Sequence, residues 1–432
     1  MTYEHTFMEK QPKTTIPCKV DVASETGRLR AVLLRRPGVE IERMTPLNAA
    51  NALYSDILDK PTVDAEYNNF CGVLERWTKV YYVKDILQEL LRDKAVRSYL
   101  VNESLRHDGR RRTAGMSPAD YALAEQFMDL SDEQLVQVLI EGYENPTWDG
   151  TSANRYLLHP LYNLLFTRDA SSTVYGRVLI NSMSFEVRER ETLLYDSIFR
   201  HFFGVETLNA SEWNPEARTE GGDVQIASPD LLCIGQGIRT NAKGIDYLAQ
   251  TFARERDHFN ILVQELPLKP ESFIHLDMVF TFLGQHRCMV FEPLLKKDGI
   301  FADKDTTLIT IDNGKISYRR VDNMLSGLHS LGWDIEPVFC GGNDPWVQLR
   351  EQWHSGANFF ALGDDKVMGY RRNTHTVDAL DKAGYAVLNA EDIISGKTDM
   401  NDYERFVAVF PGSELPRAGG GARCMTMPIW RE

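Results

Sequence analysis

The sequence predicts an α/β protein built from repeated units that form a ring or an array. Short apolar strands alternate with amphipathic helices through most of the chain, and most units read strand–strand–helix–strand. The units recur with a period of about 45 to 65 residues, which is typical of repeat architectures. Equivalent units arranged in this way place the polar residues of their strand ends around a common axis.

The first unit spans residues 29–83. An apolar strand follows Arg28 and stops at Pro37-Gly38. Thr45-Pro46 has the N-cap and first-turn chemistry of a helix that runs to residue 53, and a second helix at 63–77 leads into a strand at 79–83. Residues 1–24 are polar and are expected to be a loose leader in front of the main domain at 25–432.

Residues 84–142 differ from the rest of the chain because they carry helical spacing and no strand pattern. Two of the expected helices begin with a serine, which is a favoured N-cap. The four helices are expected at 85–92, 95–105, 117–128 and 131–140. We therefore predict an all-helical insertion within the α/β domain.

The remaining four units repeat the strand–strand–helix–strand order. Their helices are expected at 189–203, 243–256, 323–331 and 376–383. Their strands are expected at 164–166, 174–180 and 205–208, at 224–226, 231–234 and 260–266, at 278–282, 288–291 and 335–339, and at 359–362, 366–370 and 386–388.

Composition narrows the class of protein. The formal net charge of -14 argues against a nucleic-acid binder and against binding to an anionic membrane. The six cysteines are scattered without a C-x-x-C pair, which favours a reduced, cytoplasmic protein without disulfides or a zinc site. The N-terminus lacks a signal-peptide pattern, and no apolar run is long enough for a transmembrane helix.

The last stretch of the chain has a glycine run, a single cysteine and an apolar, strand-like tail. Gly419, Gly420 and Gly421 allow positive φ angles and a close approach to a ligand. Small residues that lead into one thiol, Cys424, are typical of a nucleophile held in a tight loop. The alternative is a flexible tail with a buried structural cysteine.

Polar clusters occupy corresponding places at the start of successive units. They are Asn163 to Asp169, Glu220-Gly-Gly-Asp223 and His275-Leu-Asp277. Each has a local explanation: a salt bridge between Arg168 and Asp169, a turn, and a hydrogen-bonded core histidine. Their recurrence at equivalent positions instead indicates one shared site.

The residue types of this site suit a cationic substrate. Several buried carboxylates are costly unless a cation offsets them, and a planar guanidinium matches carboxylates two at a time. A metal is the rival explanation, but the acidic residues and His275 lack close ligand spacing. A bound cation would lower the pKa of the Cys424 thiol, and His275 would be available as general acid and base.

Four motifs, taken in order, resemble the arginine deiminases of the guanidino-group-modifying (amidinotransferase) superfamily. They are Phe166-Thr-Arg168-Asp169, Glu220-Gly-Gly-Asp223, His275-Leu-Asp277-Met-Val-Phe-Thr281 and Ala422-Arg423-Cys424-Met-Thr-Met-Pro428. The resemblance runs from Ser24 to the end of the chain and includes the helical insertion. It implies a five-bladed, pseudo-symmetric α/β propeller of ββαβ units, in agreement with the five units counted above.

The resemblance also implies roles for individual residues. Cys424 resembles the nucleophile, His275 the acid and base, and Glu220 the residue that works beside His275. Asp169 and Asp277 resemble the carboxylates that clamp the guanidinium. The expected substrate-binding residues are Asn163, Arg188 and Arg239 at the α-carboxylate, Phe166 at the aliphatic stem, and Asp223 and Arg423 within the shared motifs.

One departure from the family pattern lies directly before the nucleophile. Many family members have an R-G-R-G-G run there, whereas this chain has Arg417-Ala418-Gly419-Gly420-Gly421, so that Gly419 stands where the second arginine would be. This loop is expected to gate the site.

The implied activity is the hydrolysis of free L-arginine to L-citrulline and ammonia through a covalent thiouronium on Cys424. No metal or organic cofactor is expected, because the substrate supplies the positive charge. The partner is then a small molecule, and a homo-oligomer is possible. Four alternatives stay open: an amidinotransferase, another guanidine hydrolase with the same site, a non-catalytic arginine-binding homologue, and a cysteine protease, which the carboxylate excess disfavours.

Overall fold

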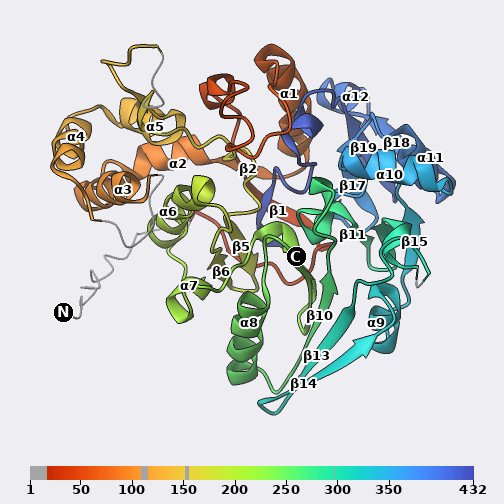
Figure 1. The fold of residues 1–432 in the computed structure, drawn as a ribbon. Helices are drawn as coiled ribbons and strands as arrows, with labels where there is room; N and C mark the ends of the chain where they lie inside the picture. Colours follow the sequence, from red (N-terminus) through yellow and green to blue (C-terminus); the bar gives the residue numbers. More distant parts are fainter. Residues whose placement is uncertain (1–16, 109–114, 151–154, 297) are drawn as a thin grey trace.

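A computed structural model describes residues 17–108, 115–150, 155–296 and 298–432 (Figure 1). Residues 1–16 of the expected leader lie outside this part. Its remaining residues are bonded to the main body: Val22 and Tyr175 exchange two backbone hydrogen bonds, and the Asp21 N–H donates to the carbonyl of Ile429. In the described part of the chain, no helix is long and apolar enough to cross a membrane.

Five sheets of the described residues share one pairing pattern. A first strand pairs antiparallel with a second, which pairs parallel with a third. In this order the strands are β20 (Met427–Arg431), β1 (Leu29–Leu34) and β2 (Lys79–Tyr82); β5 (Ser171–Val174), β6 (Arg177–Ile180) and β7 (Thr207–Asn209); β8 (Val224–Ser228), β9 (Leu231–Gln236) and β10 (His258–Glu265); β11 (Phe280–Gly284), β12 (Arg287–Val290) and β15 (Glu336–Phe339); and β16 (Phe360–Gly363), β17 (Lys366–Tyr370) and β19 (Phe406–Phe410). The C-terminal strand thus completes the first unit.

Some strands fall outside this repeated pattern. The hairpin β13 (Thr306–Asp312) and β14 (Lys315–Val321) extends the third sheet and was not predicted. The strand expected at 386–388 is β18 (Ala386–Asn389), which lies at the sheet edge, while the unpredicted β19 occupies the place next to β17. The strands β3 (Tyr143–Glu144) and β4 (Tyr156–Leu158) form a separate pair.

Helices connect the second strand of each sheet to the strands that follow. They are α1 (Lys60–Trp77), α6 (Glu189–Ser197), α8 (Ala242–Glu255), α9 (Met324–Ser330) and α11 (Thr374–Lys382). Three begin at side-chain N-caps, in which Asp59, Asn241 and Asn323 accept a backbone N–H of the first turn. Further helices are α7 (Ala210–Trp213), α10 (Pro345–Trp353) and α12 (Ala390–Ile394).

The segment predicted to be helical contains α2 (Val83–Leu90), α3 (Lys94–His107), α4 (Pro118–Met128) and α5 (Asp132–Glu141), grouped at one side of the molecule (Figure 1). The two serine N-caps are confirmed, since Ser117 and Ser131 form capping boxes with Asp120 and Gln134. Leu139 of α5 belongs to the same buried apolar cluster as residues of α6, β6 and β20. The four helices therefore share a core with the strand-containing part.

Two sequence-based elements are wrong. The helix expected at 46–53 is a series of turns. The Ala49 N–H donates to the carbonyl of Thr45 as in a helix, but Leu53 has a φ of 65° and the Tyr54 N–H donates five residues back to the carbonyl of Ala49, so the helical conformation is not continued. The strand expected at 164–166 is also a turn, in which the Phe166 N–H donates to the carbonyl of Asn163. Its apolar run reflects burial, not strand pairing.

Neighbouring sheets contact one another through their first strands or, in the sheet of β20, through its first and second strands. β20 contacts β5, β1 contacts β16, and β16 contacts β11. The third sheet shares a buried cluster with the second through Val174, Leu179 and Val224. The segments that precede the five first strands consequently converge on one region.

The shared core predicts that a cavity in the helical segment destabilises the whole protein. Leu139→Ala removes a side chain that is 1% exposed, and the free energy of unfolding should fall by about 2–5 kcal/mol. The matched control, Leu268→Ala, alters a side chain that is 64% exposed and should change it by less than about 0.5 kcal/mol. Urea unfolding followed by circular dichroism and tryptophan fluorescence should give one coincident transition. An early helical transition that leaves the fluorescence midpoint unchanged would contradict the shared core.

Candidate active site

The predicted site residues come from the segments that precede first strands. Asn163, Phe166 and Asp169 precede β5, Glu220 and Asp223 precede β8, His275 and Asp277 precede β11, and Cys424 precedes β20. All of these side chains are buried, as are Arg188, Arg239 and Arg423. The fifth such segment, before β16, holds Asn358, which sequence reasoning did not single out as a site residue.

The loop before Cys424 needs its glycines. A short 3-10 helix, Leu415–Ala418, ends at Gly419, whose φ of 95° lies in the left-handed region that favours glycine. A Cβ atom on Gly420 would lie 2.4 Å from the Phe166 ring, and one on Gly421 would lie 2.6 Å from Asn358 Oδ1. The loop therefore threads between these two side chains and carries the thiol into the interior.

The Cys424 sulfur lies among polar groups in a buried position. The Asn358 amide donates to Sγ at 3.2 Å, and the two Asp277 carboxylate oxygens lie 3.8 and 3.9 Å from it. Burial raises the pKa of the Cys424 thiol well above its usual value, and Asp277 and Asp169 raise it further. The thiol is consequently protonated at neutral pH until a positive charge arrives.

His275 is held as a charged imidazole. Its Nε2 lies 2.9 Å from Glu220 Oε2, and its Nδ1 lies 3.7 Å from Asp169 Oδ1. Burial opposes the charge, but Asp169 and the hydrogen bond to Glu220 raise the pKa of His275 to about 9. Against the cost of burial, Arg239 and His275 lower the pKa of Glu220 to about 2. The ring is therefore able to donate a proton at neutral pH.

Two buried polar atoms at the centre of the site have no hydrogen-bond partner among the described residues. They are Asp169 Oδ1 and His275 Nδ1. Unsatisfied buried polar atoms are rare in folded proteins and indicate a place for a ligand or a water molecule. Together with the carboxylate of Asp277 and the thiol of Cys424, they suit a planar cation with several N–H donors.

Asp169, Glu220 and His275 also have the donor set of a metal site, since their ligand atoms lie within 4.8 Å of one another. Two of these ligands already face cations. Arg188 pairs with Asp169 at 2.5 Å, and Arg239 pairs with Glu220 at 3.3 Å. These guanidinium groups offset the negative charge that would attract a divalent ion.

The two arginines expected at the substrate carboxylate differ in their surroundings. Arg188 donates to Asp169, to Glu191 at 2.8 Å, and to the backbone carbonyls of Asn163 and Phe166. Arg239 has fewer acceptors, because its Nε atom has no partner among the described residues and its guanidinium lies 4.6 Å from the Phe185 ring. Arg239 is therefore the freer of the two to bind an anion.

Three further predicted residues contact the protein itself. Asn163 donates to the carbonyl of Ala52 at 2.8 Å. Asp223 accepts the Leu276 N–H at 2.9 Å, and burial raises its pKa to about 7. Arg423 pairs with Glu25 at 3.0 Å and with Asp277 at 2.9 Å, so it orients a site carboxylate.

Sequence reasoning missed three residues with direct contacts to the nucleophile segment. Asn358 and Glu25 are two of them, and Arg168 is the third, because its side chain donates to the Arg423 carbonyl at 3.2 Å. The signal for Asn358 was its position before the first strand of the fifth unit, which matches the positions of the other polar clusters.

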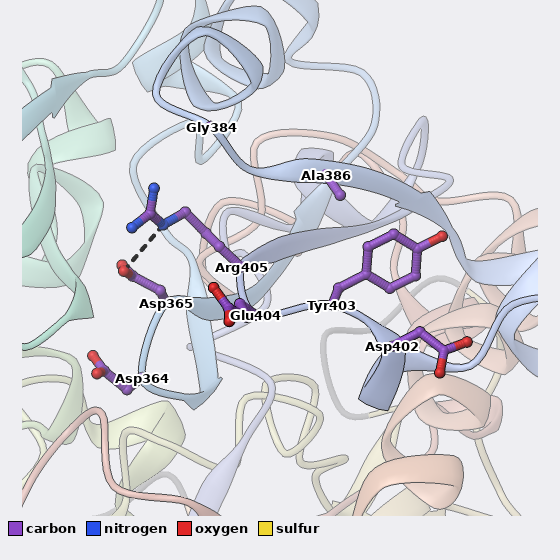
Figure 2. A pocket seen from close by; sticks show the side chains of 8 residues that line it. All are labelled: Asp364, Asp365, Gly384, Ala386, Asp402, Tyr403, Glu404 and Arg405. Atoms are coloured by element: carbon purple, nitrogen blue, oxygen red, sulfur yellow. Dashed lines mark hydrogen bonds and ion pairs between the residues drawn. The ribbon is translucent and has the colours of Figure 1, made fainter.

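A separate surface depression lies at the far end of the fifth sheet. It has a volume of about 530 Å³ and is lined by acidic residues, Tyr403 and Arg405 (Figure 2). Asp364 and Asp365 form the β16–β17 turn, whereas Asn358 and Tyr370 lie at the opposite ends of those strands. The Asp365 carboxylate already accepts from Arg405, Arg287 and Tyr385, so these side chains stabilise the turn.

Comparison with known proteins gives one family. The family model of arginine deiminase matches residues 51–431. An arginine deiminase of Borrelia garinii subsp. bavariensis is 30% identical and one of Bacillus cytotoxicus is 32% identical, and each alignment covers 96% of this chain and 98% of the relative.

Two solved structures share the fold. One is the N-terminal domain of the cyanobacterial protein ArgZ, covalently bound to a reaction intermediate, with a TM-score of 0.50, 12% identity, and coverage of 93% of this chain and 98% of that one. The other is SxtG, an amidinotransferase from Microseira wollei, with a TM-score of 0.50, 14% identity, and coverage of 96% and 98%. At these identities the likeness establishes a shared mixed α/β fold.

The raised pKa of His275 predicts a pH-dependent contribution to stability. The folded value of about 9 exceeds the ordinary value of 6.5, so the stabilisation by the charged ring is complete below pH 6.5 and is lost as the pH rises through about 9. The difference in urea midpoint between the wild type and His275→Gln should shrink between pH 7 and pH 10.

The control for this measurement is His354→Gln. Burial and Arg372 lower the pKa of His354 to about 4, so that ring is neutral throughout this pH range. The difference in urea midpoint between the wild type and His354→Gln should therefore not depend on pH between 7 and 10. A His275→Gln difference that is equally flat would mean that the His275 ring is uncharged in the folded protein.

Proposed function

The chain belongs to the arginine deiminase family, and from this premise we propose that it hydrolyses free L-arginine to L-citrulline and ammonia through a covalent adduct on Cys424. As a member of that family it is an enzyme that acts on a guanidino carbon–nitrogen bond. The observation that carries the proposal is the group of four side chains, Cys424, His275, Asp169 and Asp277, around the unpartnered Asp169 Oδ1.

The substrate guanidinium is proposed to bind between Asp169 and Asp277. Asp169 Oδ1 lacks a hydrogen-bond partner, and burial raises the pKa of Asp277 above its usual value even with Arg423 beside it. The charged forms of both carboxylates would thus be stabilised by a second cation, the substrate guanidinium. The guanidinium carbon then lies next to the Cys424 sulfur, which is 3.8 Å from Asp277 Oδ2.

The bound cation prepares the nucleophile. Its positive charge opposes the effect of burial and of the two carboxylates on the Cys424 thiol, so with substrate in place the thiol releases its proton to solvent and the thiolate forms. The thiolate attacks the guanidinium carbon, and protonated His275 donates its proton to the leaving nitrogen. Ammonia departs and leaves a thiouronium on the sulfur.

Hydrolysis of the thiouronium completes the reaction. Neutral His275 accepts a proton from water, whose oxygen attacks the same carbon. The hydroxyl group of this adduct loses its proton to solvent as the carbon–sulfur bond breaks, which releases citrulline and regenerates the Cys424 thiolate. Glu220 keeps the imidazole oriented through its 2.9 Å contact with Nε2, and its negative charge stabilises the protonated ring in the first step.

The proposal includes a closed propeller fold, a reaction without a cofactor and a cytoplasmic location. The repeated pairing of five sheets, with contacts from one sheet to the next, supports a closed five-bladed propeller in which 84–142 is an insertion. The site residues supply the catalytic groups without a cofactor. All six cysteines are free, which supports a cytoplasmic enzyme.

The direct test is the production of citrulline and ammonia from arginine by the purified protein. Cys424→Ala should lower turnover at least about 10⁴-fold, because a covalent step cannot proceed without the sulfur. Cys340→Ala, which removes another buried cysteine, should keep wild-type turnover. Citrulline formation by the Cys424→Ala protein would reject the mechanism.

Glycine or lysine added as acceptor should yield no new guanidino product, whereas such a product would identify an amidinotransferase.

The wild type should prefer arginine to agmatine, which lacks the α-carboxylate, by at least about a thousandfold in kcat/KM. Arg239→Lys keeps a positive charge near Glu220 but loses the forked donors, so activity on arginine should fall while activity on agmatine stays nearly constant. Arg188→Ala removes the cation that lies between the carboxylates of Asp169 and Glu191, which then repel each other. This variant should lose activity on both arginine and agmatine. Equal use of agmatine by the wild type would remove both arginines from the substrate site.

A further inference from the structure

Asn358 occupies the fifth of the five segments that precede first strands, and it is 1% exposed. The other four segments supply Asp169, Glu220, His275 with Asp277, and Cys424. Asn358 therefore occupies the position at which each of the other four units supplies a residue of the proposed active site. It lies between the segment that carries Cys424 and the segment that carries Asp277.

Hydrogen bonds fix the orientation of the Asn358 amide. Its Oδ1 atom accepts the backbone N–H groups of Arg423 at 2.9 Å and Cys424 at 3.2 Å. A flipped amide would direct its NH2 group at those two donors, which is unfavourable. The NH2 group must therefore point to the opposite side, where the Asp277 carbonyl lies at 3.1 Å and Cys424 Sγ lies at 3.2 Å.

The NH2 group of Asn358 matters because negative charges face the Cys424 sulfur. Burial and the carboxylates of Asp277 and Asp169 disfavour a thiolate, while a backbone hydrogen bond from Gly421 and the guanidinium of Arg423 favour it. The Tyr370 hydroxyl, which lies on the same side of the loop, is committed to the carbonyl of Gly420 at 2.9 Å. The Asn358 N–H is the side-chain donor that the described residues direct at Sγ.

We propose that Asn358 is a catalytic residue of this enzyme, which stabilises the Cys424 thiolate with one amide N–H while its oxygen holds the backbone of the nucleophile. The inference rests on the proposed role of Cys424 as nucleophile. Proton and electron balance are those of the reaction above, because Asn358 donates a hydrogen bond and transfers no proton.

The geometry leaves little room for another residue at this position. A Cβ atom on Gly421 would lie 2.6 Å from Asn358 Oδ1 and 2.7 Å from its Cβ, so the nucleophile loop is packed directly on this side chain. Aspartate has the same shape and keeps the acceptor for the two backbone N–H groups, but it loses the donor to sulfur. Asn358→Asp removes the donated hydrogen bond and adds a carboxylate beside the sulfur, and both changes disfavour the thiolate. The ¹⁵N measurement on the wild type tests the hydrogen bond by itself.

The test measures the reactivity of the sulfur without turnover. Alkylation of Cys424 by iodoacetamide is followed peptide by peptide between pH 5 and pH 11, with Cys424→Ala as the blank. In Asn358→Asp, the alkylation rate should be at least about tenfold lower at every pH below the midpoint, since a hydrogen bond to a charged group is lost and the pKa of the thiol rises by at least about one unit. Turnover should fall mainly in kcat, with KM changed less.

The matched control is Asn373→Asp. Asn373 is 2% exposed and donates its amide to the carbonyl of His354 at 3.1 Å, away from the sulfur. This variant should keep the wild-type alkylation profile even if its stability falls. An Asn358→Asp protein that is destabilised but keeps the wild-type profile would overturn the proposal, because Asn358 would then have a structural role alone.

A second measurement on the wild type does not depend on the folding of a variant. In protein labelled with ¹⁵N-asparagine, one side-chain amide resonance should titrate with the midpoint found by alkylation, and the titration should vanish in Cys424→Ala. Absence of such a resonance would also overturn the proposal. Both readouts report on the sulfur alone, so an Asn358 effect without citrulline production would reject the proposed function and keep only the hydrogen bond from Asn358 to the Cys424 thiolate.

Discussion

The guanidinium of Arg423 joins the beginning and the end of the chain and fixes the carboxylate beside the nucleophile. It pairs with Glu25 in the segment before β1 and with Asp277 before β11, and it is adjacent to Cys424. Loss of one partner from a buried charge pair costs about 3–5 kcal/mol, because the other charge is left uncompensated. The first sheet, which needs the C-terminal β20, and the position of Asp277 therefore depend on the same interaction.

Charge compensation of this kind continues through the site. Arg188 faces Asp169 and Glu191, and Arg239 faces Glu220, which in turn faces His275. Each of these acidic groups is thus buried next to a protein cation. Among the described residues, however, the Oδ1 atom of Asp169 has no hydrogen-bond partner. A substrate cation completes the set, so substrate binding and activation of the Cys424 thiol become one electrostatic event.

Sequence patterns predicted most of the repeated strands, because alternation and turn residues reflect local preferences that the fold preserves. They also predicted the polar clusters before β5, β8 and β11, since each cluster interrupts an apolar run. The strand expected at 164–166 was wrong because burial in turns gives the same apolar run as burial in a strand. The helix expected after Pro46 was wrong because the backbone leaves the helical conformation at Leu53, whose φ is 65°. Asn358 carries no charge and no distinctive motif, so its contact with Cys424 emerges only when two distant segments meet.

The central claim is that Cys424 forms a covalent thiouronium with arginine, and intact-protein mass spectrometry after acid quenching tests it most directly. The enzyme is mixed with arginine, stopped within one turnover and weighed, and the modified peptide is sequenced. We expect a fraction of the protein to gain the mass of arginine less ammonia, with the addition on Cys424 and none in Cys424→Ala. Citrulline production by the wild type with no adduct at any quench time would contradict the covalent mechanism.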